Sequence, residues 1–153
     1  MNKSFRNSLG LLGVLLALAG QPAFALTPGQ KLSDAEIAQL GKMPVYKIGR
    51  LELRGIPSQG ADDGITLVLN QQGVVGLSRN EITVTGVSEQ DLQARIAQVF
   101  PQPVAVQHFE PTGITVVRYA DFSQAVDGLR ILKKALPEAT VRLAVQFNVK
   151  VPY

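Results

Sequence analysis

The strongest constraint on the fold is a strand–helix–strand pattern that occurs twice between Ile82 and Val151. In each copy an Ile-Thr-Val segment precedes an amphipathic helix, a proline follows the helix, and an Ala-Val-Gln segment lies in the next strand. The expected strands are 82–85, 104–109, 114–117 and 140–151, and the expected helices are 88–100 and 123–136. The pattern predicts two tandem β-α-β units within one small domain.

Both expected helices carry apolar residues along one side. Leu92 and Ile96 mark that side in the first helix, and Val126 and Leu129 mark it in the second. The last strand alternates apolar and polar residues, which is typical of a sheet with one face packed on the core and the other exposed to solvent. Its apolar positions are Val141, Leu143, Val145, Phe147, Val149 and Val151. We therefore predict an α+β fold: a small mixed or antiparallel sheet with two helices on one face, in a split βαβ, ferredoxin-like arrangement.

A short helix and a hairpin are expected before this unit. Ser33 and Glu36 form a capping box, which predicts a helix that ends at Gly41. This helix is about two turns long, so its stability must come from docking on the main body. Three further segments are predicted: a strand at 45–53 that bends at Gly49, a loop at 57–64, and a hairpin of strands 65–69 and 74–77.

The N-terminus has the three parts of a secretory signal peptide. These are the positive residues Lys3 and Arg6, the apolar stretch Leu11–Ala19, and the small residues Ala23 and Ala25 at an A-x-A cleavage site. The apolar stretch is about half of the roughly 20 residues that a membrane span needs, which favours a cleaved signal over an uncleaved anchor. We therefore expect residues 1–25 to be removed. Residues 26–153 are then expected to form a single periplasmic domain without stable membrane insertion.

The composition restricts the class of partner and indicates what stabilises the fold. Two of the 15 Lys and Arg residues lie in the expected signal peptide, so the remaining cations nearly balance the 12 Asp and Glu residues. This balance, without any basic run, argues against a nucleic-acid partner. The chain has no cysteine, although an exported protein could form disulfides. Packing of a hydrophobic core must therefore supply the stability, and thiol catalysis and cysteine-ligated metals are excluded.

No residue pattern in the sequence predicts catalysis or a cofactor. His108 is the only histidine, and an acid–base role beside Glu110 would need a third group that is not evident. Asp62 and Asp63 are the only adjacent carboxylates, and the spacing of a calcium loop fails after these two. The glycines and serines form neither a phosphate-binding loop nor a nucleophile elbow. We therefore predict that the protein is not an enzyme and holds no metal or cofactor.

Segments between Ile65 and Phe147 resemble the periplasmic domain of the ExbD/TolR family. The likeness lies in the strand pair Ile65–Leu69 and Gly73–Leu77, the capped helix start Ser88–Leu92, the strand end Val116–Asp121, and the closing helix and strand from Val126 to Leu143. Members of this family couple an inner-membrane proton motor to outer-membrane processes. The chain lacks the family's transmembrane helix with its proton-handling aspartate. The resemblance therefore implies binding to partner proteins or to the cell wall, without proton conduction.

The lack of reactive groups and the long alternating C-terminal strand predict an interaction module. If strand 140–151 lies at a sheet edge, a strand of another envelope protein could pair with it. The polar side chains expected along this strand are those of Arg142, Gln146, Asn148 and Lys150. The alternative is a carrier for a small molecule or a cell-wall fragment, with its site on the open sheet face or under the short N-terminal helix. The oligomeric state is not predicted.

Overall fold

The computed structural model describes residues 25–57 and 64–148. Ala23, the carboxylate pair Asp62 and Asp63, and Lys150 lie outside these ranges. Ala25, the second residue of the predicted cleavage site, is the first described residue and is exposed. None of the helices in these ranges combines the length and the apolar character that a membrane span requires. Cleavage of a signal peptide stays a prediction.

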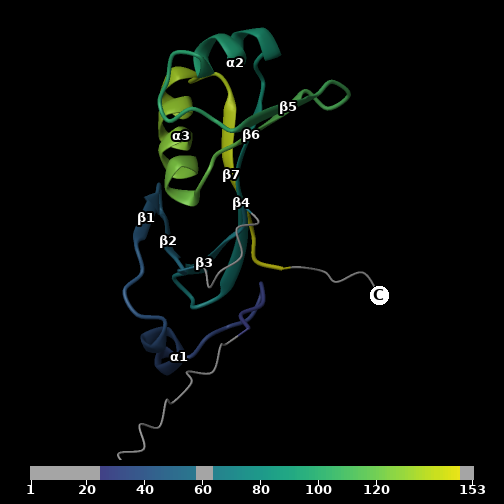
Figure 1. The fold of residues 1–153 in the computed structure, drawn as a ribbon. Coiled ribbons are helices and arrows are strands. Elements are labelled where there is room, and N and C mark those ends of the chain that lie inside the picture. The colour runs from purple at the N-terminus through teal and green to yellow at the C-terminus, as the bar shows by residue number, and fades with distance from the viewer. Residues whose placement is uncertain (1–24, 58–63, 149–153) are drawn as a thin grey trace, which may run out of the picture.

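The described residues form an α+β fold with three helices and seven strands (Figure 1). The helices are α1 (Asp34–Gln39), α2 (Glu89–Ile96) and α3 (Phe122–Ala135). The strands are β1 (Val45–Ile48), β2 (Leu51–Gly55), β3 (Thr66–Asn70), β4 (Val75–Thr85), β5 (Ala105–Phe109), β6 (Ile114–Arg118) and β7 (Thr140–Gln146). They belong to one sheet in which every strand pair is antiparallel. The predicted fold class is confirmed.

The second half of the chain has the split βαβ connectivity that the doubled pattern predicts. Its four strands lie in the order β7-β4-β6-β5, so each β-α-β unit encloses one strand of the other. One core joins both helices to one face of these strands. Its members include Ile82 of β4, Leu92 of α2, Val117 of β6, Leu129 of α3 and Val141 of β7, each at most 3% exposed.

Helix α2 begins where the capping residue predicts but ends earlier than expected. The Ser88 hydroxyl accepts a hydrogen bond from the Asp91 N–H at 3.1 Å. The helix stops at Ile96, so the predicted end at Phe100 is wrong. Pro101 excludes a helix through Phe100, because a proline disfavours the helical conformation of the residue before it. The Ile96 carbonyl accepts from the Val99 N–H at 3.3 Å and from the Gln102 side chain at 3.2 Å.

Strand β4 is one strand of 11 residues, although two strands separated by a gap were predicted for this segment. It pairs with β3 through Val75–Ser78 and with β6 through Glu81–Thr85, so its neighbour on that side changes at Asn80. On its other side it pairs with β7, and that register shifts across the same residue. Asn80 has a φ of 59°, a conformation that asparagine tolerates better than most residues. The polar residues from Ser78 to Glu81 interrupt the apolar pattern by which a strand is recognised in a sequence.

Strands β1 and β2 form a hairpin, so the prediction of one bent strand at 45–53 is wrong. Ile48 pairs with Leu51, which leaves Gly49 and Arg50 as a two-residue turn. Gly49 has a φ of 60°, which suits the first position of a tight hairpin turn. The apolar parity shifts across Gly49 because the chain reverses there. The hairpin contacts α3 (Figure 1).

Helix α1 and the residues before it cover the opposite face of the sheet near β3. The capping box is confirmed, since the Ser33 N–H donates to the Glu36 carboxylate at 2.8 Å. Leu69 of β3 is buried with Leu32 on this face, whereas its neighbour Val68 is buried against α3 on the other. Helices on one face alone, as predicted, therefore describe the β7-β4-β6-β5 part of the sheet. The prediction is wrong for the sheet near β3.

Candidate functional site

Strand β7 lies at an edge of the sheet, as the interaction hypothesis requires. Its partner strand among the described residues is β4, with Gln146 opposite Leu77 at one end. The lead-in before α1 forms a bridge between Lys31 and Val74 of the turn that precedes β4. One long side of β7 therefore has no partner strand in the part of the chain that the structure describes.

Side chains on one face of β7 fix this edge strand to the core. Val141 is 3% exposed, and Leu143, Val145 and Phe147 are partly buried. The Phe147 ring lies directly on Gly76 of β4, where a β-carbon would come within 2.7 Å of a ring carbon. Glycine at this position of β4 lets the aromatic ring approach the backbone. The edge is therefore a firmly seated strand that is open on one side.

The backbone groups of alternate β7 residues point away from the sheet. The Ser78 hydroxyl donates to the Ala144 carbonyl at 3.1 Å and the Thr83 hydroxyl donates to the Arg142 carbonyl at 3.5 Å, so both carbonyls face β4. Successive residues of an antiparallel strand direct their amide and carbonyl groups to opposite sides. The residues whose N–H and C=O groups face the open side are therefore Val141, Leu143 and Val145.

The predicted interaction residues are only partly brought together on this edge. Arg142 and Gln146 are exposed on β7 and share the sheet face opposite to α2 and α3. Asn148 is exposed, but it lies beyond the end of β7, so the prediction that the strand runs through it is wrong. Lys150 lies outside the described residues. The structure thus supports two of the four predicted side chains as members of one strand surface.

His108 takes part in a strand contact. It lies on β5 opposite Thr115 of β6, and its Nδ1 atom is 2.8 Å from the Thr115 hydroxyl. Glu110 is exposed in the following turn, and no salt bridge between described residues involves it. Within residues 25–57 and 64–148, no three His, Cys, Asp or Glu side chains gather as metal ligands would. These positions show no acid–base pair built around His108.

Two titratable groups among the described residues have shifted pKa values, and each shift has a local cause. The Ser33 backbone N–H, and then its hydroxyl, donate hydrogen bonds that hold the pKa of Glu36 below its usual value. Burial raises the pKa of Tyr119 to about 12. The Tyr119 hydroxyl has no hydrogen-bond partner among the described residues. Both shifts arise from contacts that build the fold, and neither residue belongs to β7.

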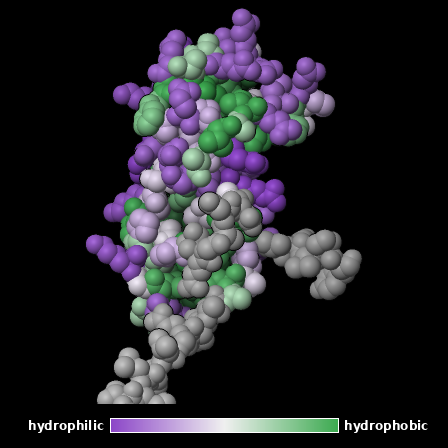
Figure 2. Space-filling model, viewed as in Figure 1, coloured by the Kyte–Doolittle hydropathy of each residue, from purple (hydrophilic) through white to green (hydrophobic). Residues whose placement is uncertain are grey.

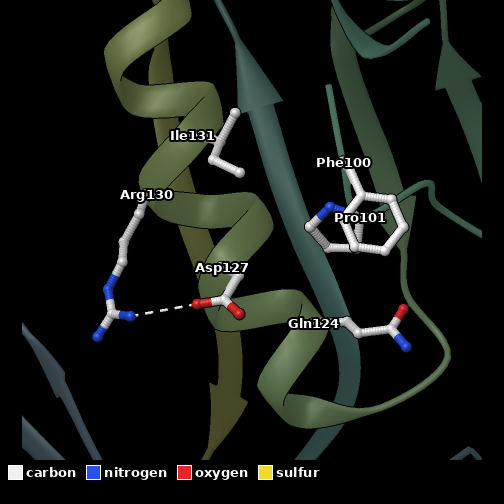
Figure 3. Close-up of a pocket in the computed structure, with 6 residues that line it drawn as sticks. All are labelled: Phe100, Pro101, Gln124, Asp127, Arg130 and Ile131. Carbon is white, nitrogen blue, oxygen red and sulfur yellow. Dashed lines mark hydrogen bonds and ion pairs between the residues drawn. The ribbon is translucent and has the colours of Figure 1, made fainter. Parts of the chain in front are cut away.

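A groove of about 330 Å³ opens beside α3 (Figure 3). Its apolar lining comes from Phe100, Pro101 and Ile131, and its polar lining comes from Gln124, Asp127 and Arg130. Figure 3 shows Arg130 turned away from Phe100 and toward Asp127, to which it donates at 3.2 Å. Phe100 is 83% exposed. The groove is not expected from the sequence pattern, which places Phe100 inside a helix, although Pro101 indicates that the helix ends before Phe100.

A second groove, of about 410 Å³, lies beside α1, where the carrier hypothesis expects a binding site. Its lining residues are Lys31, Leu32, Ser33, Asp34, Ile37, Gln71, Gln72 and Gly73. The lining mixes polar and apolar surface in similar amounts, and the Ser33 groups in it already bond to Glu36. Both grooves reach the roughly 300 Å³ that small-molecule sites need. The carrier hypothesis therefore has two places in the fold to which it can be assigned.

Comparisons with known proteins assign no relative to this chain. No family model, no curated protein and no solved structure matches it. The resemblance to the ExbD/TolR family therefore stays a prediction that rests on the short sequence segments named above. The function has to be argued from the fold, the edge strand and the surface chemistry.

Proposed function

We propose that the protein is a non-catalytic interaction module of the periplasm, which binds another envelope protein by strand addition to β7. The observation that carries this proposal is the open side of β7, where alternate N–H and C=O groups have no partner strand among the described residues. The predicted signal peptide supports the compartment. The resemblance to ExbD/TolR proteins supports a link to envelope energy transduction.

Strand addition at β7 has physical advantages over binding by a mobile loop. The strand is held in place by Val141 in the core and by the Phe147 ring on Gly76. A partner strand therefore forms its backbone hydrogen bonds without first ordering the receiving edge. Arg142 and Gln146 flank the edge on the open sheet face, where they can contact alternate side chains of the partner. Backbone pairing supplies affinity, and these side chains supply specificity.

The Val145→Pro variant tests the proposal directly. Proline removes an N–H that faces the open side, and edge strands tolerate proline where the N–H is not part of the ladder. Val145→Ala is the matched control, because it shortens the same side chain and keeps the N–H. We expect the wild type and Val145→Ala to retrieve the same envelope protein in pull-down experiments, and Val145→Pro to lose it, with all three chains folded by circular dichroism.

Two results would contradict the proposal at different levels. Retrieval of the same partner by Val145→Pro would show that binding does not use the β7 backbone. A wild-type chain that retrieves no reproducible partner from envelope extracts would contradict the interaction function itself.

The groove beside α3 favours a second function, a carrier for a small molecule or a cell-wall fragment. Phe100 and Pro101 lie on one side of the groove, and Ile131, Asp127 and Gln124 of α3 lie on the other (Figure 3). Native mass spectrometry of the chain recovered from the envelope distinguishes this function from the first. A carrier would show an added mass that Ile131→Glu removes, whereas an interaction module would show the mass of the chain alone.

A further inference from the structure

Strands β1 and β2 and the outward side of α3 form a flank rich in cations. We define this basic flank as Lys47, Arg50, Arg54, Arg130, Lys133 and Lys134, all of them exposed. Arg130 joins the two parts, because its Nη2 donates to the Lys47 carbonyl at 3.1 Å. Lys133 and Lys134 follow Arg130 by three and four residues, so they lie on the same side of α3. Figure 1 shows β1 beside α3, and Figure 2 shows hydrophilic residues along that side.

Carboxylates neutralise only part of the basic flank. Glu52 Oε1 lies 3.9 Å from Arg54 Nη2, and Asp127 Oδ1 lies 3.2 Å from Arg130 Nη1. The flank thus carries six cations against two carboxylates. The remaining described residues carry six cations against eight carboxylates, so they have a small negative balance. The positive excess of the described chain is therefore concentrated on this flank, which points to an anionic partner.

Exposed apolar side chains lie beside these cations. Val45 lies opposite Arg54, on the same hairpin face as Lys47, and is 52% exposed. Leu51 follows Arg50 on the other face of the hairpin and is 41% exposed. A soluble polyanion binds through charge alone and gains little from exposed aliphatic groups. A lipid surface takes both kinds, because cations bind its anionic headgroups while apolar side chains enter the headgroup region.

We infer that the basic flank docks the domain on an anionic lipid bilayer. The attraction acts over about 10 Å at moderate ionic strength, and each Lys or Arg near the surface adds to it. Val45, on the same hairpin face as Lys47 and Arg54, supplies shallow apolar contact, so the domain binds at the surface without spanning the bilayer. This docking uses β1, β2 and α3 and leaves the open side of β7 to a protein partner. It is independent of strand addition.

Flotation with lipid vesicles tests this inference. The chain recovered from an expressing bacterium, with its N-terminus recorded by mass spectrometry, is mixed with phosphatidylcholine vesicles or with vesicles in which about a third of the lipid is phosphatidylglycerol. We expect flotation with the anionic vesicles, little with the others, and a loss of binding as salt is raised. The double variant Lys133→Gln, Lys134→Gln should bind the anionic vesicles roughly tenfold more weakly or worse.

The matched control is the double variant Lys31→Gln, Arg95→Gln, which removes the same charge from exposed positions outside the flank. This control should bind the anionic vesicles as tightly as the wild type. Because all the chains share the same N-terminus, any lipid binding by the N-terminus is equal in all of them. Equal binding to both kinds of vesicle, or equal loss in the two double variants, would overturn the inference. Binding to soluble heparin without binding to anionic vesicles would assign the flank to a polyanion and also overturn it. Vesicle binding by Val145→Pro separates this docking from strand addition.

Discussion

Tyr119 and Gly128 show how one buried side chain determines its neighbour. Tyr119 is 1% exposed, and its ring occupies the place that a β-carbon on Gly128 would take. Gly128 lies in the interior of α3, where glycine costs about 1 kcal/mol relative to alanine. The close approach of the tyrosine ring explains a residue that helix propensity alone would reject. The same burial leaves the phenol hydroxyl without a hydrogen-bond partner among the described residues.

The buried phenol predicts a loss of stability at high pH. The pKa of Tyr119 is raised to about 12 in the folded chain, while a phenol in an unfolded chain titrates near 10. The neutral phenol of Tyr119 therefore contributes fully to the free energy of unfolding below pH 10. This contribution falls as the pH rises toward 12, because the phenol loses its proton first in the unfolded state. Urea unfolding of the wild type and of Tyr119→Phe at about pH 8 and pH 11 measures how the free energy of unfolding changes with pH. We expect the variant to lose less stability between the two values. An equal loss in both chains would contradict the assignment.

Strand β7 depends on one close contact at its C-terminal end. Phe147 lies on Gly76, and Val145 Cγ1 would lie 3.1 Å from a β-carbon there. A side chain at position 76 must displace the aromatic ring, because the backbone of β4 cannot withdraw from its partners β3 and β7. The end of the candidate interaction edge is therefore positioned by a glycine on the neighbouring strand.

The Gly76→Ala variant should loosen this end of β7. We expect it to destabilise the fold by about 1–3 kcal/mol, the usual cost of overpacking. Hydrogen exchange of the amides that face β4 should become faster at Gln146 and change little at Arg142. A double-mutant cycle with Phe147→Ala checks the cause, since the cost of Gly76→Ala should shrink when the ring is absent. The same cost in both backgrounds would show that the ring does not mediate the effect.

The whole molecule is organised along β4, which carries different neighbours at its two ends. The β3 end is buried under α1 on one face and α3 on the other, while the β6 end belongs to the split βαβ unit. Asn80 connects these parts. Its side chain accepts from the Thr66 hydroxyl at 2.9 Å and donates to the Gly64 carbonyl at 3.2 Å, and its carbonyl accepts from the Tyr119 N–H at 2.9 Å.

Substitution of Asn80 should therefore weaken the molecule as a whole. Asn80→Ala removes two side-chain hydrogen bonds from a buried site. It also places alanine, which tolerates a positive φ less well than asparagine, in the left-handed conformation. We therefore expect the free energy of unfolding to fall by about 2 kcal/mol or more. Asn80→Gly loses the same bonds without the conformational penalty and should be the more stable of the two. Urea denaturation compares them. An alanine variant as stable as the glycine variant would contradict the role given to the backbone conformation.

Local patterns in the sequence determined the fold class, the two β-α-β units and the starts of α1 and α2. Each depends on neighbours along the chain: the capping groups of Ser33 and Ser88, and the one-sided apolar spacing of the helices. The alternation of 140–151 likewise predicted the strand that forms the candidate site, although β7 ends at Gln146.

The tertiary structure alone decided the remaining features, because these depend on contacts between distant residues. Among them are the continuity of β4 through Asn80 and the turn at Gly49, as well as the edge position of β7. The groove beside α3 and the basic flank form only when α3 packs beside segments far from it in sequence, as when Arg130 reaches Lys47. No local sequence pattern indicates a contact between residues so far apart in the chain. Surfaces assembled from several elements could therefore not be predicted from the sequence.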